Sequence, residues 1–93
     1  MTIRVEETEI RGRWTTDAGK VEADQTCRRI EQLVAGYLRE VGRDASGWDV
    51  LYSDPSDGRY WELIYPESHL HGGGPPTLRN LTEEEARKKY RVP

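Results

Sequence analysis

The stretch Gly47–Pro76, GWDVLYSDPSDGRYWELIYPESHLHGGGPP, decides the fold of this chain. Two segments rich in aromatic and β-branched residues, Trp48–Tyr52 and Arg59–Tyr65, flank the turn-forming run Asp54–Gly58. Strand-like segments on either side of such a run are typical of a β-hairpin. Within the run, the proline pre-sets a turn angle, the aspartates can accept hydrogen bonds from the backbone, and the final glycine can close the loop in the left-handed conformation. The stretch therefore predicts a β-hairpin.

The simplest pairing across this loop places Tyr52 opposite Tyr60 and Leu51 opposite Trp61. Because side chains alternate between the two faces of a strand, each face then has its own composition. We expect the first face to pack on the core. The second is either covered by the segment after Pro66 or open to a partner, and covering is the more common fate of a large apolar patch. The first face carries Leu51, Trp61, Leu63 and Tyr65, and the second carries Trp48, Tyr52, Tyr60, Ile64 and Glu62.

Apolar residues between Asp24 and Gly42 recur at three- and four-residue spacing, which is the spacing of one face of an α-helix. Asp24 is a suitable N-cap and Gly42 a suitable C-terminal stop. We therefore expect a long amphipathic helix over about 24–41. Its apolar stripe consists of Cys27, Ile30, Leu33, Val34, Tyr37, Leu38 and Val41.

Weaker signals frame these two elements. Near the start of the chain, a strand over Ile10–Thr15 can pair with a short strand at Lys20–Glu22 across a turn at Asp17–Gly19. Near its end, Thr82 and Glu85 form a capping box, which predicts a short C-terminal helix over about 83–90.

Together these elements predict a small single domain of the α+β class, spanning residues 1–93. We expect an antiparallel sheet of about four strands, with the long helix packed on it and the short helix at the C-terminus. The 14 basic and 17 acidic residues nearly balance, at a formal net charge of −3. Such a balance supplies no excess positive charge for a phosphate backbone, so we expect no nucleic acid partner.

The cysteine count and the hydropathy pattern indicate a compartment. Cys27 is the single cysteine and cannot form a disulfide within the chain, which favours a reducing environment. Met1 is followed by charged residues instead of the apolar core of a signal peptide, and no apolar run is long enough to span a membrane. The sequence therefore predicts a cytoplasmic protein without a membrane partner.

Few groups in the sequence suit catalysis or metal binding. His69 and His71 have a spacing that fits two zinc ligands, but no third or fourth ligand lies nearby. The run His71–Gly74 matches an oxyanion-hole motif of lipases and esterases, yet the chain has no G-x-S-x-G nucleophile elbow. The acids around Gly58 do not fit the register of a calcium-binding loop. We predict no catalytic residue, no metal site and no cofactor, and a small enzyme that depends on histidine or a metal is the less favoured alternative.

Most of the chain is similar to a known family. The positions that carry the similarity are Gly47, Trp48, Leu51, Tyr52, Asp54, Pro55, Asp57–Arg59, Trp61–Leu63, Tyr65, Pro66, Ser68, His71–Pro76 and Leu78, with Gly12–Trp14 and the helix around Arg29 and Ile30 upstream. At these positions the chain resembles immunity protein family twenty-seven of bacterial polymorphic toxin systems.

The resemblance implies an inhibitor and not an enzyme. Such a protein is encoded beside a toxin, binds the cognate toxin domain in the cytoplasm and blocks its active site. A generic cytosolic protein-binding module is the alternative. We expect the partner-binding residues to be Trp48, Tyr52, Asp54, Asp57, Tyr60 and Glu62. The motif residues that we expect to shape the scaffold are Gly58, Arg59, Trp61, Pro66, His71, Gly72, Gly73, Gly74 and Pro75.

Overall fold

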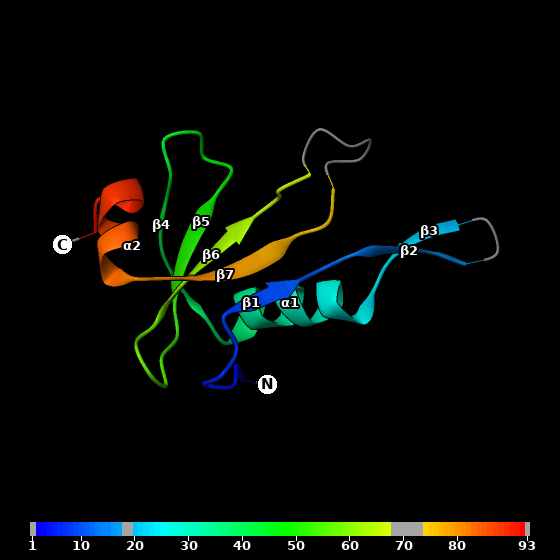
Figure 1. Cartoon of the computed structure of the whole chain (residues 1–93), viewed down its shortest axis with the longest axis horizontal. Helices are drawn as coiled ribbons and strands as arrows, with labels where there is room; N and C mark the ends of the chain where they lie inside the picture. Colours follow the sequence, from blue (N-terminus) through cyan, green and yellow to red (C-terminus); the bar gives the residue numbers. More distant parts are fainter. Residues whose placement is uncertain (1, 18–19, 68–73, 93) are drawn as a thin grey trace.

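The computed structural model describes residues 2–17, 20–67 and 74–92, and describes 15–17 and 20–23 by their backbone only. In the described chain, strands β1–β3 precede the first helix, and strands β4–β7 lie between it and the second helix (Figure 1). In order they are β1 (Glu9–Arg11), β2 (Trp14–Asp17), β3 (Lys20–Ala23), α1 (Gln25–Gly36), β4 (Arg39–Arg43), β5 (Val50–Ser53), β6 (Tyr60–Ile64), β7 (Thr77–Leu81) and α2 (Glu83–Tyr90).

The strands form an antiparallel sheet of five and a separate hairpin of two. The sheet has the order β1-β7-β6-β5-β4, and β2 pairs with β3 alone. The molecule measures 47 × 29 × 20 Å along its three principal axes. Figure 1 shows this small hairpin extending away from the body along the longest of them. The α+β class is confirmed, with five strands in the main sheet where about four were expected.

The first predicted strand divides into two at Gly12. Before it, β1 joins the main sheet beside β7, and after it β2 enters the small hairpin, which confirms the pairing expected with the segment at Lys20. The Gly12 amide donates to the Pro76 carbonyl at 2.9 Å. A Cβ at this position would lie 2.6 Å from the Cys27 sulfur and 2.7 Å from the Pro76 oxygen. Only glycine allows this close crossing of three segments.

The helix α1 begins as predicted and ends earlier than predicted. The Asp24 side chain accepts a hydrogen bond from the Cys27 amide at 2.9 Å, which confirms the N-cap. The helix ends at Gly36, so the expectation of a helix to about 41 with a stop at Gly42 was wrong. Residues 39–43 instead form β4, which pairs with β5 and carries a bulge next to Gly42. The apolar spacing near Val41 fits a helix, but the pairing with β5 determines the conformation.

The β5–β6 hairpin is confirmed, and its predicted register was wrong by one residue. Tyr52 pairs with Trp61, and Leu51 pairs with Glu62. The predicted turn comprised Asp54–Gly58. In the structure the Asp54 amide donates to the Arg59 carbonyl at 2.9 Å, so these two residues pair and the loop shortens to residues 55–58. The shift moves Tyr52 to the face of Trp61 and moves Leu51 to the face of Glu62.

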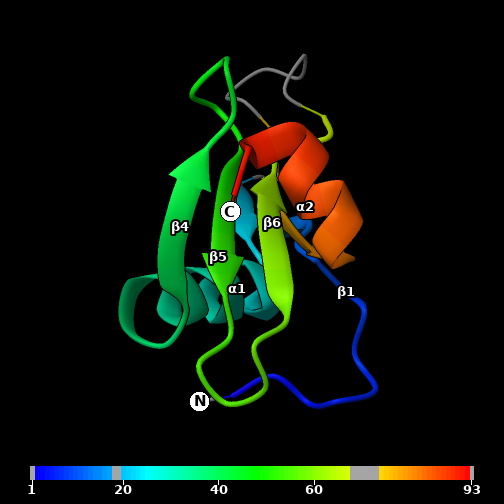
Figure 2. The ribbon, with the colours of Figure 1, turned by 90° about the vertical axis from the view of Figure 1, so that its left-hand side faces the viewer.

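The two helices cover opposite faces of the sheet (Figure 2). The α1 face holds the larger core, and the α2 face holds a smaller one. The segment after Pro66 was expected to cover the second hairpin face. The helix α2 packs on this face beside Tyr60, and residues 68–73 of the expected segment lie outside the described residues. The larger core comprises Ile3, Ile10, Ile30, Leu33, Leu38, Val50, Tyr52, Trp61, Leu63 and Leu78, and the smaller one Leu51, Leu81, Ala86 and Tyr90.

The helix α2 has the predicted bounds and the predicted cap. The Glu85 amide donates to the Thr82 hydroxyl at 3.1 Å, and the Thr82 amide donates to the Glu85 carboxylate at 2.9 Å. This reciprocal pair confirms the capping box. It also fixes where the chain turns from β7 onto the second face of the sheet.

Candidate partner-binding surface

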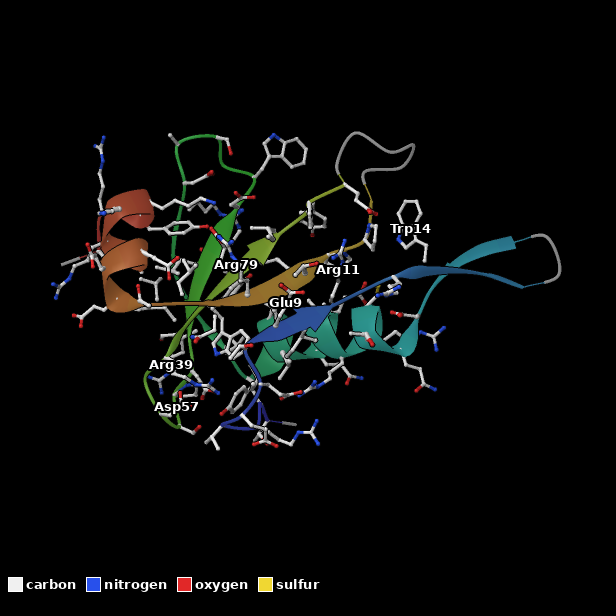
Figure 3. All side chains as sticks on the ribbon, viewed as in Figure 1. Glu9, Arg11, Trp14, Arg39, Asp57 and Arg79 are labelled. Atoms are coloured by element: carbon white, nitrogen blue, oxygen red, sulfur yellow. The ribbon has the colours of Figure 1, made fainter. Side chains whose placement is uncertain are left out.

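The six residues predicted to bind a partner do not form one surface. Trp48 is 76% exposed, Asp57 is exposed and Tyr60 is half-buried. Tyr52, Asp54 and Glu62 are buried, so no partner reaches them in this conformation. The residues also lie at different ends of the sheet. Figure 1 places the β4–β5 turn, which carries Trp48, at the end opposite the β5–β6 loop, where Figure 3 labels Asp57.

Glu62 is a buried carboxylate that fastens α2 to the sheet. Its oxygens accept from Arg79 of β7 at 2.8 Å, Lys89 at 2.5 Å and Tyr90 at 2.8 Å. Burial raises the pKa of Glu62, but these hydrogen bonds outweigh it and hold the pKa below its usual value. Burial and the contact with Glu62 raise the pKa of the Tyr90 hydroxyl. This acid therefore serves the scaffold, because its charge is satisfied internally.

Asp54 organises the β5–β6 loop from inside the protein. One carboxylate oxygen accepts from the Tyr37 hydroxyl at 2.5 Å, the Ser56 amide at 2.8 Å and the Ser56 hydroxyl at 2.9 Å. Burial raises the pKa of Asp54, and the bonds from Tyr37 and Ser56 lower it further than burial raises it. Gly58 closes the loop at φ +77°, as the sequence predicted. The loop is thereby tied to the end of α1.

Arg59 fastens the N-terminal segment to the same loop. Its guanidinium donates to the Glu7 carbonyl at 2.8 Å and to the Arg4 carbonyl at 3.1 Å, and it also contacts Asp57 at 2.8 Å. The same group lies 5.0 Å from the ring centre of Trp61. Arg59, which was expected to shape the scaffold, therefore joins segments that are more than fifty positions apart in sequence, and its guanidinium lies over the ring of Trp61.

An ion pair that the sequence did not predict also holds the N-terminal segment, at Glu7. Arg29 of α1 donates to both oxygens of Glu7, each at 2.8 Å. The hydrogen bond from Arg29 is the largest cause that lowers the pKa of Glu7, to about 2. Neither residue stands in a motif that predicts the pairing, because the contact joins positions 22 apart in sequence.

The described part of the glycine–proline segment, residues 74–76, includes a glycine with a special backbone conformation. Gly74 has φ +72°, and a Cβ there would lie 2.4 Å from the Glu67 carbonyl oxygen. Pro66 lies in the turn that follows β6, and Pro75 is buried. The other motif residues expected here, His71, Gly72 and Gly73, lie outside the described residues, as does His69.

The β4–β5 turn, Asp44–Asp49, is the second ordered turn of the hairpin region. The Asp44 carboxylate accepts from the Ser46 hydroxyl at 2.7 Å and from the Gly47 amide at 3.0 Å. The Ser46 hydroxyl accepts from the Trp48 amide at 3.1 Å, and Gly47 has φ +79°. The bond from Ser46 is the main cause that lowers the pKa of Asp44. The Asp, Ser and Gly residues of this segment are the types that build such turns.

Two clefts lie at the far end of the sheet, on either side of Trp14. One encloses about 240 Å³ and is mainly apolar, between α1 and Tyr65. The other encloses about 420 Å³ beside Arg11, whose guanidinium lies 3.8 Å from Glu67. Trp14 is 37% exposed, and Figure 3 shows it near Arg11. The larger cleft is lined by Arg11, Gly12, Arg13, Trp14, Glu67 and Pro75.

Among the described residues, no group of three or more His, Cys, Asp and Glu side chains is placed to hold a metal ion. No helix in that part of the chain is long and apolar enough to cross a membrane.

Comparison with known proteins identifies a family. The family model described as Immunity protein 27 matches residues 16–82, which include α1, the strands β4–β7 and both ordered turns. Searches of curated proteins and of solved structures gave no match. Because the family match spans well over half of the 93 residues, this chain belongs to the Immunity protein 27 family.

Proposed function

We propose that this protein neutralises a cognate bacterial toxin domain in the cytoplasm by binding it directly. Membership of the Immunity protein 27 family carries the proposal. The toxin domain is encoded beside this protein, and the complex keeps substrate away from the toxin active site. The protein acts as a stoichiometric inhibitor and not as an enzyme.

The scaffold suits an inhibitor that binds without large rearrangement. The sheet is covered on both faces by helices, and its buried acids Asp54 and Glu62 are held by internal hydrogen bonds. Binding by a preorganised surface avoids the entropy cost of ordering loops at the interface. A rigid fold of this kind allows tight association over an ordinary interface area.

Co-expression tests the proposal. The toxin domain encoded next to this protein is expressed in a bacterial host with and without it, and growth is measured. We expect the toxin alone to arrest growth and the pair to grow normally. A catalytically inactive toxin variant should co-purify with this protein as a stable complex. Failure of both rescue and co-purification contradicts the proposal.

Titration of the purified toxin separates binding from catalysis. If inhibition is stoichiometric, residual toxin activity falls linearly and reaches its minimum near one equivalent of this protein. An enzyme that modifies the toxin would reach full inhibition with far less than one equivalent. The second result would overturn the proposed mechanism while leaving the immunity role in place.

A further inference from the structure

Trp48 is presented to solvent in a way that the other two tryptophans are not. Its side chain is 76% exposed, compared with 37% for Trp14 and 0% for Trp61. A tryptophan buries a large apolar surface on association, and this residue type is enriched among the few that dominate binding energy. An indole on the surface of a small, highly charged protein therefore marks a candidate contact.

The turn that carries Trp48 is fixed by its own side chains. Asp44 binds the Ser46 hydroxyl and the Gly47 amide, and its own amide donates to the Asp49 carbonyl at 3.1 Å. Ser46 in turn accepts the Trp48 amide at 3.1 Å. The backbone on both sides of the indole is thereby held before any partner arrives.

The same turn is connected to the buried interior. The Lys89 ammonium lies 2.8 Å from Asp49 and 2.5 Å from Glu62, which is fully buried beneath α2. This chain of charges joins the end of the turn to the sheet and to the second helix. The turn therefore cannot swing as a hinged loop without breaking a partly buried ion pair.

From these observations we propose that the turn Asp44–Asp49 is the centre of the toxin-binding surface, with the Trp48 indole filling an apolar pocket of the toxin domain. The inference rests on the proposed function. Because the turn is ordered in advance, little conformational entropy is lost when the indole is buried. The partner is a folded protein with a concave apolar pocket of indole size.

Affinity measurements with point variants test this surface. The purified protein is titrated with a catalytically inactive toxin domain by isothermal titration calorimetry. We expect Trp48→Ala to weaken Kd by at least about 30-fold, the loss typical of a hot-spot residue. Trp48→Phe keeps an aromatic ring and should stay within about 10-fold of the unmodified protein. The thermal midpoints of both variants should match the unmodified protein, because the side chain is exposed.

Trp14→Ala is the matched control, since Trp14 is the other partly exposed tryptophan and lies between the two clefts at the far end of the sheet. We expect its Kd to remain within about 3-fold of the unmodified protein. An unchanged Kd for Trp48→Ala overturns the turn proposal and leaves the proposed function intact. A larger loss for Trp14→Ala than for Trp48→Ala also overturns it and places the toxin at the clefts. Failure of the unmodified protein to bind refutes the proposed function itself.

Discussion

The two ends of strand β5 carry turns of the same local design and opposite surroundings. At each end an aspartate accepts several hydrogen bonds, Asp54 in one loop and Asp44 in the other. Each turn also has a glycine with positive φ, Gly58 at +77° and Gly47 at +79°. The Asp54 carboxylate is buried and bonded to Tyr37 at the end of α1, whereas the Asp44 turn presents Trp48 to solvent. Turn chemistry alone therefore does not separate a turn with a buried aspartate from a turn with an exposed tryptophan.

The difference lies in what each turn touches. Asp54 is 1% exposed and bonds to Tyr37 at the end of α1, and Arg59 beside it holds the N-terminal segment. The Asp44 turn is attached to α2 by the ion pair of Asp49 with Lys89. We expect substitutions at the first end to change stability, and substitutions at the second end to change binding.

Replacing Asp54 should have the largest effect on stability. Asp54→Ala removes the acceptor of the Tyr37 hydroxyl and of two groups of Ser56. Hydrogen bonds to a buried charged group contribute about 1.5–3 kcal/mol, so we expect a loss of about 2–4 kcal/mol. Urea unfolding followed by circular dichroism measures it. A loss no greater than that of Asp44→Ala would contradict the contrast between the two turns.

The second largest effect is expected at Arg59, because its guanidinium donates hydrogen bonds to three backbone carbonyls of the N-terminal segment. We expect Arg59→Ala to lower the free energy of unfolding by about 1–3 kcal/mol and to speed amide exchange in residues 4–7. Arg39→Ala is the matched control, since Arg39 lies exposed on the edge strand β4. If both variants are equally stable, the guanidinium of Arg59 does not anchor the segment.

Acid should release the anchored end through Glu7. Its pKa falls from 4.5 to about 2 in the folded protein, mainly because of the hydrogen bond from Arg29. A lowered pKa contributes stability that is fully present above pH 4.5 and is lost as the pH falls toward 2. We expect Glu7→Gln to remove on the order of 1–3 kcal/mol at neutral pH and to flatten the dependence of unfolding free energy on pH in this window.

Glu6→Gln is the control for that acid titration, because the Glu6 side chain is 68% exposed. Its curve should follow that of the unmodified protein. A Glu7→Gln curve with the same slope as the unmodified protein would show that the Glu7–Arg29 pair does not contribute to acid stability.

Asp44→Ala should have the smallest effect on stability. The turn lies at the surface, so we expect the urea midpoint to move by only a small fraction of the shift for Asp54→Ala. The variant should nevertheless loosen the backbone at Gly47 and Trp48. The Gly47 amide loses its bond to the Asp44 carboxylate, and the Ser46 hydroxyl that accepts from the Trp48 amide loses its own acceptor. Amide order parameters from NMR relaxation measure this loosening. Unchanged order parameters would show that Asp44 does not preorganise the turn.

The parts of the fold that rest on local signals could be predicted from sequence. The capping box of Thr82 and Glu85 and the N-cap at Asp24 bond within three residues, and both were found. The strand β4 and the hairpin register depend on pairing between strands, β4 with β5 and β5 with β6, and both were missed. Tertiary pairing outweighs the helical spacing that extends to Val41.

The candidate surface could be predicted only in part for the same reason. The register decides which hairpin residues are buried. From the sequence, Tyr52 and Trp48 were expected on the same face, although Tyr52 is 7% exposed and Trp48 is 76% exposed. The burial of Glu62 depends on Arg79, Lys89 and Tyr90, which arrive from β7 and α2. No pattern around Glu62 itself reveals these partners.

Hydrogen exchange of the protein alone and in complex with a catalytically inactive toxin domain tests the central claim most directly. It needs no substitution and reports both ends of β5 in one experiment. We predict that the complex slows amide exchange across residues 44–49 and leaves the loop at 55–58 unchanged. Protection of 55–58, or of the segment around Trp14, with no change at 44–49 would contradict the account.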